Sequence, residues 1–394
     1  MKTIIGAGLA ATFAKAQEEK PAGKKIGWAL VGLGSLSTNQ IAPALLKTSH
    51  SRLAAVVTGT PEKGVKWREQ YGLMESDVFN YENFDKIADH PDVDVICIVL
   101  PNSMHHEFTL RAAKLGKHVY CEKPMAVSSA ECREMIAACD AAKVKLGIAY
   151  RCQFEPHHME AMRFAREKVF GEVSHIDAGF GFKIGDPTQW RLRKNLAGGG
   201  ALMDVGVYAL QAARYLAGEE PEIISAIETK TDKEKFAEVD ETIQWQMKFP
   251  SGKTANLYTT YNLNGYNEFT VFAEQGQFGL KSAYGYGGQN GWTSKRTSRF
   301  LSLQPTISKC KWISFPKPLW KAGNGKWTAP RASAISSLVK LFTNPSPKAS
   351  PWRWRRCETC ASPLSEKHQR QRGDEQGGED IEHHADADHF PLRD

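Results

Sequence analysis

The sequence predicts two domains, an α/β domain built on a parallel sheet and an α+β domain built on an open, predominantly antiparallel sheet. The chain has 394 residues, of which 41% are hydrophobic and 24% charged, as expected for a soluble globular protein of about two domains. Up to about Tyr150, short β-rich runs alternate with helical segments. After Arg151, long runs alternate apolar and polar residues, which is typical of half-buried antiparallel strands.

The first domain is predicted over residues 24–150. Its short apolar runs alternate with helical segments, one of which is closed by Gly72. Such alternation predicts a parallel sheet with helices on both faces. Strands are expected over 26–34, 52–59, 93–101, 118–124 and 145–150, and helices over 39–48, 65–72, 105–117 and 129–143.

The second domain is predicted over residues 151–295. Its two helical stretches are interspersed with alternating runs that predict an open sheet. An exposed sheet face needs a partner, so we expect a homodimer or homotetramer. Helices are expected over 157–171 and 197–218, and strands over 173–182, 222–231, 241–249, 253–262 and 268–282.

A glycine motif follows the first strand. Gly32 and Gly34 flank Leu33, Ser35 comes next, and Ser37 stands where the third glycine of a G-x-G-x-x-G motif would be. A strand, glycines and a helix at the head of a βαβ pattern predict a dinucleotide site, because glycines let the backbone approach a pyrophosphate at a helix N-terminus. The alternative is a plain strand-to-helix turn.

The end of the second strand indicates which dinucleotide binds. An NAD site usually has an acid there, but the run is VVTGTPEKG. Thr58 and Thr60 can hydrogen-bond a 2′-phosphate and Lys63 can neutralise it. NADP is therefore favoured, while Glu62 keeps NAD open.

Polar residues gather where two later strands of the first domain end. Pro101, Asn102 and His105 follow one strand, and Glu122 and Lys123 follow the next. Ligands of open α/β sheets bind at this edge, so we expect these residues near the cofactor. A lysine between a glutamate and a proline just past a buried strand is expected to be held in place.

Six motifs occur in a fixed order: Gly-x-Gly, PNSxH, EKP, YRC, QWRLR and GGGxLMDxGxY. In this combination the chain resembles the Gfo/Idh/MocA oxidoreductase family from about Lys24 to about Trp292. The resemblance implies a Rossmann domain, a second domain for substrate binding and oligomerisation, and a tightly held NADP that one sugar reduces and another reoxidises.

The resemblance also implies roles for single residues. Lys123 matches the lysine that orients substrate and nicotinamide, Asp204 the substrate-binding acid, and Tyr208 the proton-transferring group. The chemistry agrees, because a tyrosine with an ordinary pKa of about 10 needs a nearby cation to act as a base, and Lys123 is expected to be that cation. Four further substrate-binding residues are expected: Tyr150, Arg151, Trp190 and Arg191.

Other functions stay open at this point. The protein could be an ordinary sugar or inositol dehydrogenase with exchangeable NAD(P), or a non-catalytic sugar- or nucleotide-binding protein. The net charge of +7 is not gathered into a basic block with interleaved aromatics, which argues against nucleic acid as a partner. Neither a membrane partner nor a metal is expected.

The N-terminus, residues 1–23, resembles a removable export signal. Lys2 precedes a short apolar core from Ile4 to Phe13 and an A-x-A sequence at Ala14–Ala16. The core is too short to span a bilayer. We expect a periplasmic protein, exported by the twin-arginine route if an arginine pair precedes Met1, or a cytoplasmic one if the signal does not function.

The tail, residues 296–394, does not continue the resemblance. Its cysteines and histidines form only one C-x-x-C pair, which is weak evidence for zinc. Codons read one nucleotide earlier permit residues similar to the family's C-terminal helices, so we hypothesise a frameshift between about Trp292 and Pro305 that leaves a disordered tail. Among the eight cysteines, Cys97, Cys121, Cys132 and Cys139 are expected as free buried thiols.

Overall fold

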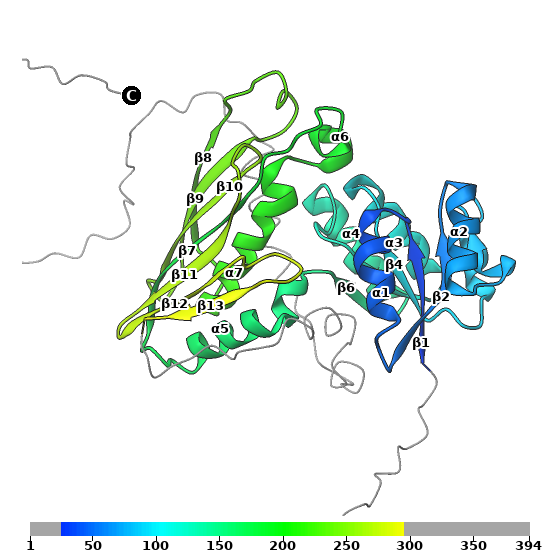
Figure 1. Ribbon diagram of the computed structural model, residues 1–394, viewed down its shortest axis with the longest axis horizontal. Helices are drawn as coiled ribbons and strands as arrows, with labels where there is room; N and C mark the ends of the chain where they lie inside the picture. The colour runs from blue at the N-terminus through cyan, green and yellow to red at the C-terminus, as the bar shows by residue number, and fades with distance from the viewer. Residues whose placement is uncertain (1–24, 295–394) are drawn as a thin grey trace, which may run out of the picture. The chain divides into compact units, whose positions relative to one another are not determined.

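Two β-sheets organise the part of the chain that the structure, a computed structural model, describes, residues 25–294 (Figure 1). The first sheet is parallel and the second is mixed and mostly antiparallel, as the sequence predicts. The expected export signal and the expected frameshifted tail lie outside the described residues. No helix within 25–294 is long and apolar enough to cross a membrane.

The first sheet has six strands in the order β3-β2-β1-β4-β5-β6, and every neighbouring pair is parallel. The two-residue strand β3 was too short to be predicted from a pattern. The strands are β1 (Ile26–Val31), β2 (Ser51–Val57), β3 (Val78–Phe79), β4 (Val95–Ile98), β5 (His118–Cys121) and β6 (Leu146–Ile148).

Helices cover both faces of this sheet. Along β1, Ala29 and Val31 belong to one buried cluster and Trp28 and Leu30 to another, because successive side chains point to opposite faces. Gly72 ends α2 in the left-handed conformation, φ 63°, as predicted. The predicted helix at 39–48 is a π turn, Ser37–Ile41, running into a short α1. The helices are α1 (Ala42–Leu45), α2 (Pro61–Tyr71), α3 (His105–Lys114) and α4 (Ser129–Ala141).

The second sheet has seven strands in the order β13-β12-β11-β7-β10-β9-β8, and only the β7–β10 pair is parallel. The predicted strand at 268–282 is two strands, because the chain turns back at residues 274–275, and β13 was not predicted. The strands are β7 (Val173–Gly181), β8 (Ile223–Thr229), β9 (Thr242–Lys248), β10 (Thr254–Thr260), β11 (Tyr266–Ala273), β12 (Gly276–Lys281) and β13 (Asn290–Thr293).

One face of the second sheet packs against α7 and α5. On β9, Ile243, Trp245 and Met247 are buried in that core, while Gln244 and Gln246 point the other way and are exposed. The opposite face of the sheet carries no helix among the described residues, which agrees with the predicted open sheet (Figure 1). The helices are α5 (Pro156–Arg166), α6 (Lys194–Ala197) and α7 (Val207–Ala217).

Candidate active site

Lys123, just after β5, reaches the second domain at Asp204. Its ammonium donates to the backbone oxygen of Asp204 at 2.6 Å and to carboxylate oxygen Oδ1 at 3.1 Å. Both side chains are mostly buried, with exposed fractions of 14% and 16%. The lysine at the end of a parallel strand and the acid of the glycine-rich stretch therefore meet, as the sequence predicts for residues of one site.

The other carboxylate oxygen of Asp204 is also bound. Arg191 Nε donates to Oδ2 at 3.1 Å, and the hydroxyl of Tyr261 donates to the same oxygen at 3.0 Å. Burial alone would raise the pKa of Asp204, but attraction to Lys123 and Arg191 outweighs it and holds the pKa below its usual value. Asp204 is therefore a fixed carboxylate anion.

Tyr208 lies one turn beyond Asp204, near the start of α7. The Lys123 ammonium is 5.1 Å from the centroid of its ring, and the guanidinium carbon of Arg151 is 5.7 Å away. Burial raises the pKa of Tyr208 above its ordinary value, and Arg151 is the cation that acts to lower it. The sequence interpretation assigns this role to Lys123, whose ammonium lies over the ring face, so Tyr208 has two cations beside it.

Asp240 explains Gly200, the last of the three glycines before Asp204. Its carboxylate accepts from the backbone N–H groups of Gly200 and Leu202, each at 2.7 Å. A Cβ on Gly200 would lie 1.9 Å from the Asp240 backbone oxygen, so no larger residue fits without a shift. Asp240 thereby fixes the start of the π turn Leu202–Gly206 that carries Asp204.

The first glycine of the predicted dinucleotide motif, Gly32, packs closely against Val99, just after β4. Gly32 adopts φ 93°, and a Cβ there would lie 2.3 Å from the Val99 oxygen, whereas a Cβ on Gly34 would meet nothing within 4 Å. The hydroxyl of Ser37 donates to the Gly32 oxygen at 2.6 Å and braces the turn. Leu33 is buried and Ser35 is exposed. The backbone at Gly34 is therefore open to a ligand.

The threonines expected at a 2′-phosphate follow β2. Thr58 is buried and its Oγ1 accepts from Thr60 N at 3.1 Å, which leaves its hydroxyl hydrogen to donate. Thr60 and Lys63 are exposed at the start of α2. All three residues thus lie between the end of β2 and the first turn of α2.

The polar residues after β4 mainly brace the site. Asn102 Nδ2 donates to the Ala197 oxygen at 2.8 Å, which ties the first domain to the second. His105 is fully buried, with its ring nitrogens 2.8 Å from the Pro124 oxygen and 2.9 Å from the Leu100 oxygen. It thus holds the loop of Pro101 to the loop of Lys123.

Glu122 is buried beside Lys123. Its Oε2 accepts from the Lys123 backbone N–H at 3.1 Å. Burial raises the pKa of this carboxyl group from 4.5 to about 7, against the opposing attraction of Lys123.

Comparison with known proteins identifies the family. Residues 26–150 match the oxidoreductase family with an NAD-binding Rossmann fold, and residues 158–279 match the GFO/IDH/MocA C-terminal domain. The chain belongs to the Gfo/Idh/MocA oxidoreductase family. It is an NAD(P)-dependent oxidoreductase, since its relatives are dehydrogenases and reductases.

Three proteins of known name are similar to this member of the Gfo/Idh/MocA family. The D-xylose 1-dehydrogenase [NADP(+)] of Haloarcula marismortui is 29% identical over 68% of this chain and 75% of the relative. A trans-1,2-dihydrobenzene-1,2-diol dehydrogenase of Xenopus laevis is 30% identical over 59% of this chain and 68% of the relative. The aldose-aldose oxidoreductase of Caulobacter crescentus, solved with glycerol, is 48% identical with a TM-score of 0.67, covering 68% of this chain and 81% of that chain.

The remaining predicted residues of this Gfo/Idh/MocA protein divide into two groups. Arg191 and Arg151 belong to the Asp204–Tyr208 cluster. The guanidinium carbon of Arg191 lies 4.6 Å from the ring centroid of Trp190. Tyr150 instead packs against the core of the second domain. It is therefore not brought into the cluster.

The sequence interpretation missed Tyr261 and Tyr286. Tyr261 directly follows β10 and binds Asp204, and Tyr286 lies in the β12–β13 loop with its ring 4.2 Å from the Arg151 guanidinium. Neither belongs to one of the six family motifs, so no sequence signal marked them.

The cysteines of this family member are free where the structure describes them. Cys97, Cys121 and Cys139 are buried, as predicted, and Cys132 is only half-buried. Among residues 25–294, no group of three or more histidine, cysteine, aspartate or glutamate side chains could hold a metal.

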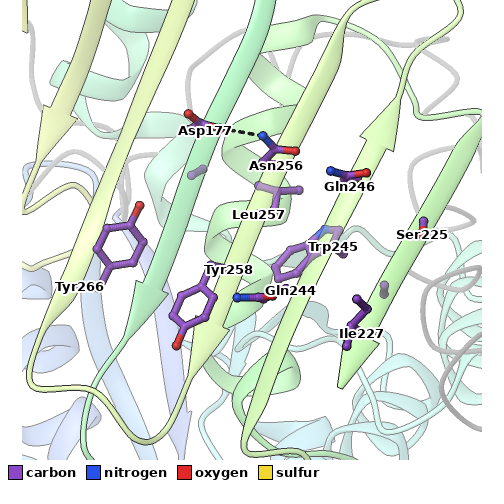
Figure 2. A pocket seen from close by; sticks show the side chains of 12 residues that line it. Asp177, Ser225, Ile227, Gln244, Trp245, Gln246, Asn256, Leu257, Tyr258 and Tyr266 are labelled. Atoms are coloured by element: carbon purple, nitrogen blue, oxygen red, sulfur yellow. Dashed lines mark hydrogen bonds between the residues drawn. The ribbon is translucent and has the colours of Figure 1, made fainter. Parts of the chain in front are cut away.

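A hollow on the open face of the second sheet is separate from this cluster (Figure 2). Gln244, Gln246, Asn256 and Tyr258 project into it, and Asn256 donates to Asp177 at 3.3 Å. It contains amides, aromatic rings and one acid but none of the residues around Lys123.

Proposed function

We propose that this protein is an NADP-dependent sugar oxidoreductase that transfers hydride between a sugar carbon and a tightly bound nicotinamide. The observation that carries the proposal is the meeting of Lys123 with Asp204 and Tyr208, which joins a cation, an anion and a phenol beside the edge of a dinucleotide-binding sheet. Similarity to a D-xylose dehydrogenase and to an aldose-aldose oxidoreductase supports a sugar substrate. Within the family, the motifs resemble those of glucose-fructose oxidoreductase.

Oxidising a sugar hydroxyl requires loss of a hydride and of a proton. When bound, the nicotinamide takes up or returns the hydride. The Tyr208 phenolate accepts the proton and becomes the neutral phenol, and Arg151, whose guanidinium carbon lies 5.7 Å from the ring centroid, stabilises the phenolate that would otherwise be costly in a buried site. Asp204 accepts hydrogen bonds from sugar hydroxyls, and Lys123 donates to the reacting oxygen, so that the hydroxyl is oriented toward the cofactor.

The residues present fit NADP. The Gly32–Gly34 turn has the positive φ and the open backbone that a pyrophosphate needs. Thr58, Thr60 and Lys63 would hold the 2′-phosphate, since two hydroxyl donors and a cation suit that group and no acid stands between β2 and Thr60. NAD is the alternative cofactor.

One experiment separates the proposal from its rivals. A cofactor that is never released copurifies with the protein, and adding glucose should then raise the absorbance of the reduced-nicotinamide band without added NADP. An ordinary sugar or inositol dehydrogenase with exchangeable NAD(P) would need added cofactor. A non-catalytic sugar- or nucleotide-binding protein would show no change in either case.

Two further proposals concern assembly and location. The helix-free face of the second sheet, with Ile223 54% and Ile227 64% exposed, is a surface for a second copy of the chain in a homodimer or homotetramer. Sedimentation at several concentrations tests this. We also propose export to the periplasm, which fractionation of expressing cells tests.

A further inference from the structure

The loop between β12 and β13, residues 282–289, carries two tyrosines to the cluster around Tyr208. Tyr284 is 2% exposed and its ring packs against those of Phe180 and Tyr208, at centroid distances of 5.4 and 5.7 Å. Tyr286, two residues on, is 40% exposed. The loop therefore has a buried anchor and an accessible second phenol.

Three elements fix the backbone of this loop before Tyr286. His158 Nε2 lies 2.8 Å from the Ala283 oxygen, Arg151 donates to the Tyr284 oxygen, and Asn267 Oδ1 accepts from Tyr284 N at 2.7 Å. The anchors come from α5, the turn before it and β11. The backbone two residues before Tyr286 is therefore held in place.

Arg151 also links Tyr286 to the phenol that transfers the proton. Its guanidinium carbon is 4.2 Å from the Tyr286 ring centroid and 5.7 Å from that of Tyr208. One cation between two aromatic rings holds them near each other.

The charges around Tyr286 come from both domains. Burial raises the pKa of its phenol to about 12, with further contributions from Tyr208 and Glu122, against the opposing effects of Arg151 and Lys123. These groups are the residues of the proposed active site. Tyr286 therefore lies beside Arg151 at the edge of this cluster.

We propose that Tyr286 contacts the substrate as a specificity-determining residue. Its ring packs against the apolar C–H groups of the sugar, and its hydroxyl hydrogen-bonds a sugar hydroxyl away from the reacting carbon. A tyrosine suits this role because it offers an apolar face and a polar tip with little rotamer entropy to lose. The assignment rests on the proposed function and deepens it.

The test uses the full-length, NADP-loaded protein with Tyr286→Phe, Tyr286→Ala and the distant control Tyr71→Phe. D-glucose and D-xylose serve as probes, their binding measured by calorimetry and their oxidation by nicotinamide absorbance. Tyr286→Phe loses one hydrogen bond, which should raise the KM and the Kd for the aldose about 3- to 10-fold. Its kcat should stay within about 2-fold of the wild-type value. Tyr286→Ala should raise the KM and the Kd for the aldose further, because the packing of the ring is lost as well. Affinity for NADP should not change in either variant.

Two results would overturn the assignment in different ways. If the wild-type protein binds and oxidises an aldose and both Tyr286 variants do so with unchanged KM, Tyr286 does not touch the substrate, while the proposed function stands. A fall in kcat at constant KM likewise contradicts a binding role. If the wild-type protein neither binds nor oxidises either aldose, the proposed function fails and the assignment fails with it.

Discussion

Lys123 and Asp204 contact each other twice, through the lysine ammonium at 2.6 Å from the backbone oxygen and 3.1 Å from the carboxylate. One residue follows a strand of the parallel sheet and the other lies at the start of the helix that covers the second sheet. Because breaking a buried pair leaves an uncompensated charge, this contact fixes the lysine where it can also lie over the Tyr208 ring.

Tyr208→Phe should lower the rate of reduction of the bound nicotinamide by about 100-fold or more, as expected on removing a general acid or base. The ring packing is kept, so affinity for cofactor and the melting temperature should stay near wild type. Absorbance of reduced nicotinamide after mixing with glucose measures the effect. Turnover close to wild type would rule out the role assigned to the phenol.

Gly32→Ala should abolish cofactor binding, because the new Cβ would meet the Val99 oxygen at 2.3 Å and the residue sits at φ 93°. Gly72→Ala is the matched control, since Gly72 also has positive φ, 63°, but a Cβ there meets nothing within 4 Å. The control should lose about 1 kcal/mol of unfolding free energy and bind NADP normally. Equal NADP affinity in the two variants would contradict a dinucleotide site at this turn.

Lys63→Ala combined with Thr60→Asp should shift preference from NADP toward NAD. The change removes the cation for a 2′-phosphate and supplies an acceptor for a ribose hydroxyl. The ratio of kcat/KM for the two cofactors, or of their Kd values, reports the shift. An unchanged ratio would mean that other residues recognise the 2′-phosphate.

Asp240→Ala should destabilise the protein by about 2 kcal/mol or more, because two buried backbone donors, those of Gly200 and Leu202, lose their acceptor. It should also reduce turnover, since the turn carrying Asp204 is no longer fixed. Asp240→Asn, which keeps one acceptor oxygen, should lie between wild type and Asp240→Ala. Urea unfolding and glucose turnover check the order of the three proteins.

Glu122 should make stability depend on pH. Its pKa rises from 4.5 to about 7 on folding, so the folded state binds the proton more tightly than the unfolded state. This contribution to stability is present below about pH 4.5 and is lost as the pH rises through 7. At about 1.4 kcal/mol per pKa unit, the loss is on the order of 3 kcal/mol.

The matched variant for this test is Glu122→Gln, which keeps the shape and cannot ionise. The difference in unfolding free energy between this variant and wild type should grow in favour of the variant between pH 5 and pH 8. A constant difference across that range would contradict a raised pKa for Glu122.

The fold was predictable wherever the local pattern is strong. Alternation of apolar runs with helices gave the parallel sheet, and Gly72 marked the end of α2. The strand pair β11–β12 was read as one run because the turn at residues 274–275, Glu-Gln, lacks the glycine or proline that usually marks a hairpin there. Strand β3 depends on tertiary pairing with β2 alone.

The site was predictable in part. The family resemblance groups Lys123, Asp204 and Tyr208, and the structure brings the three side chains together. It did not mark Arg151 as a second cation beside the Tyr208 ring, because Lys123 and Arg151 follow neighbouring strands and only side-chain direction brings both to the phenol. Tyr261 is a single aromatic after an ordinary strand, and nothing local distinguishes it.

The parallel pairing of β7 with β10 has a consequence for the order of folding. In this pair His175 lies opposite Thr254, so the two strands meet only after the whole intervening segment, including Asp204 and Tyr208, has been made. Tyr261, which donates to Asp204, follows directly after β10. Such non-local pairing forms slowly. A chain still emerging from the ribosome therefore completes its cofactor-binding domain first, and becomes able to act on substrate only when synthesis has passed β10.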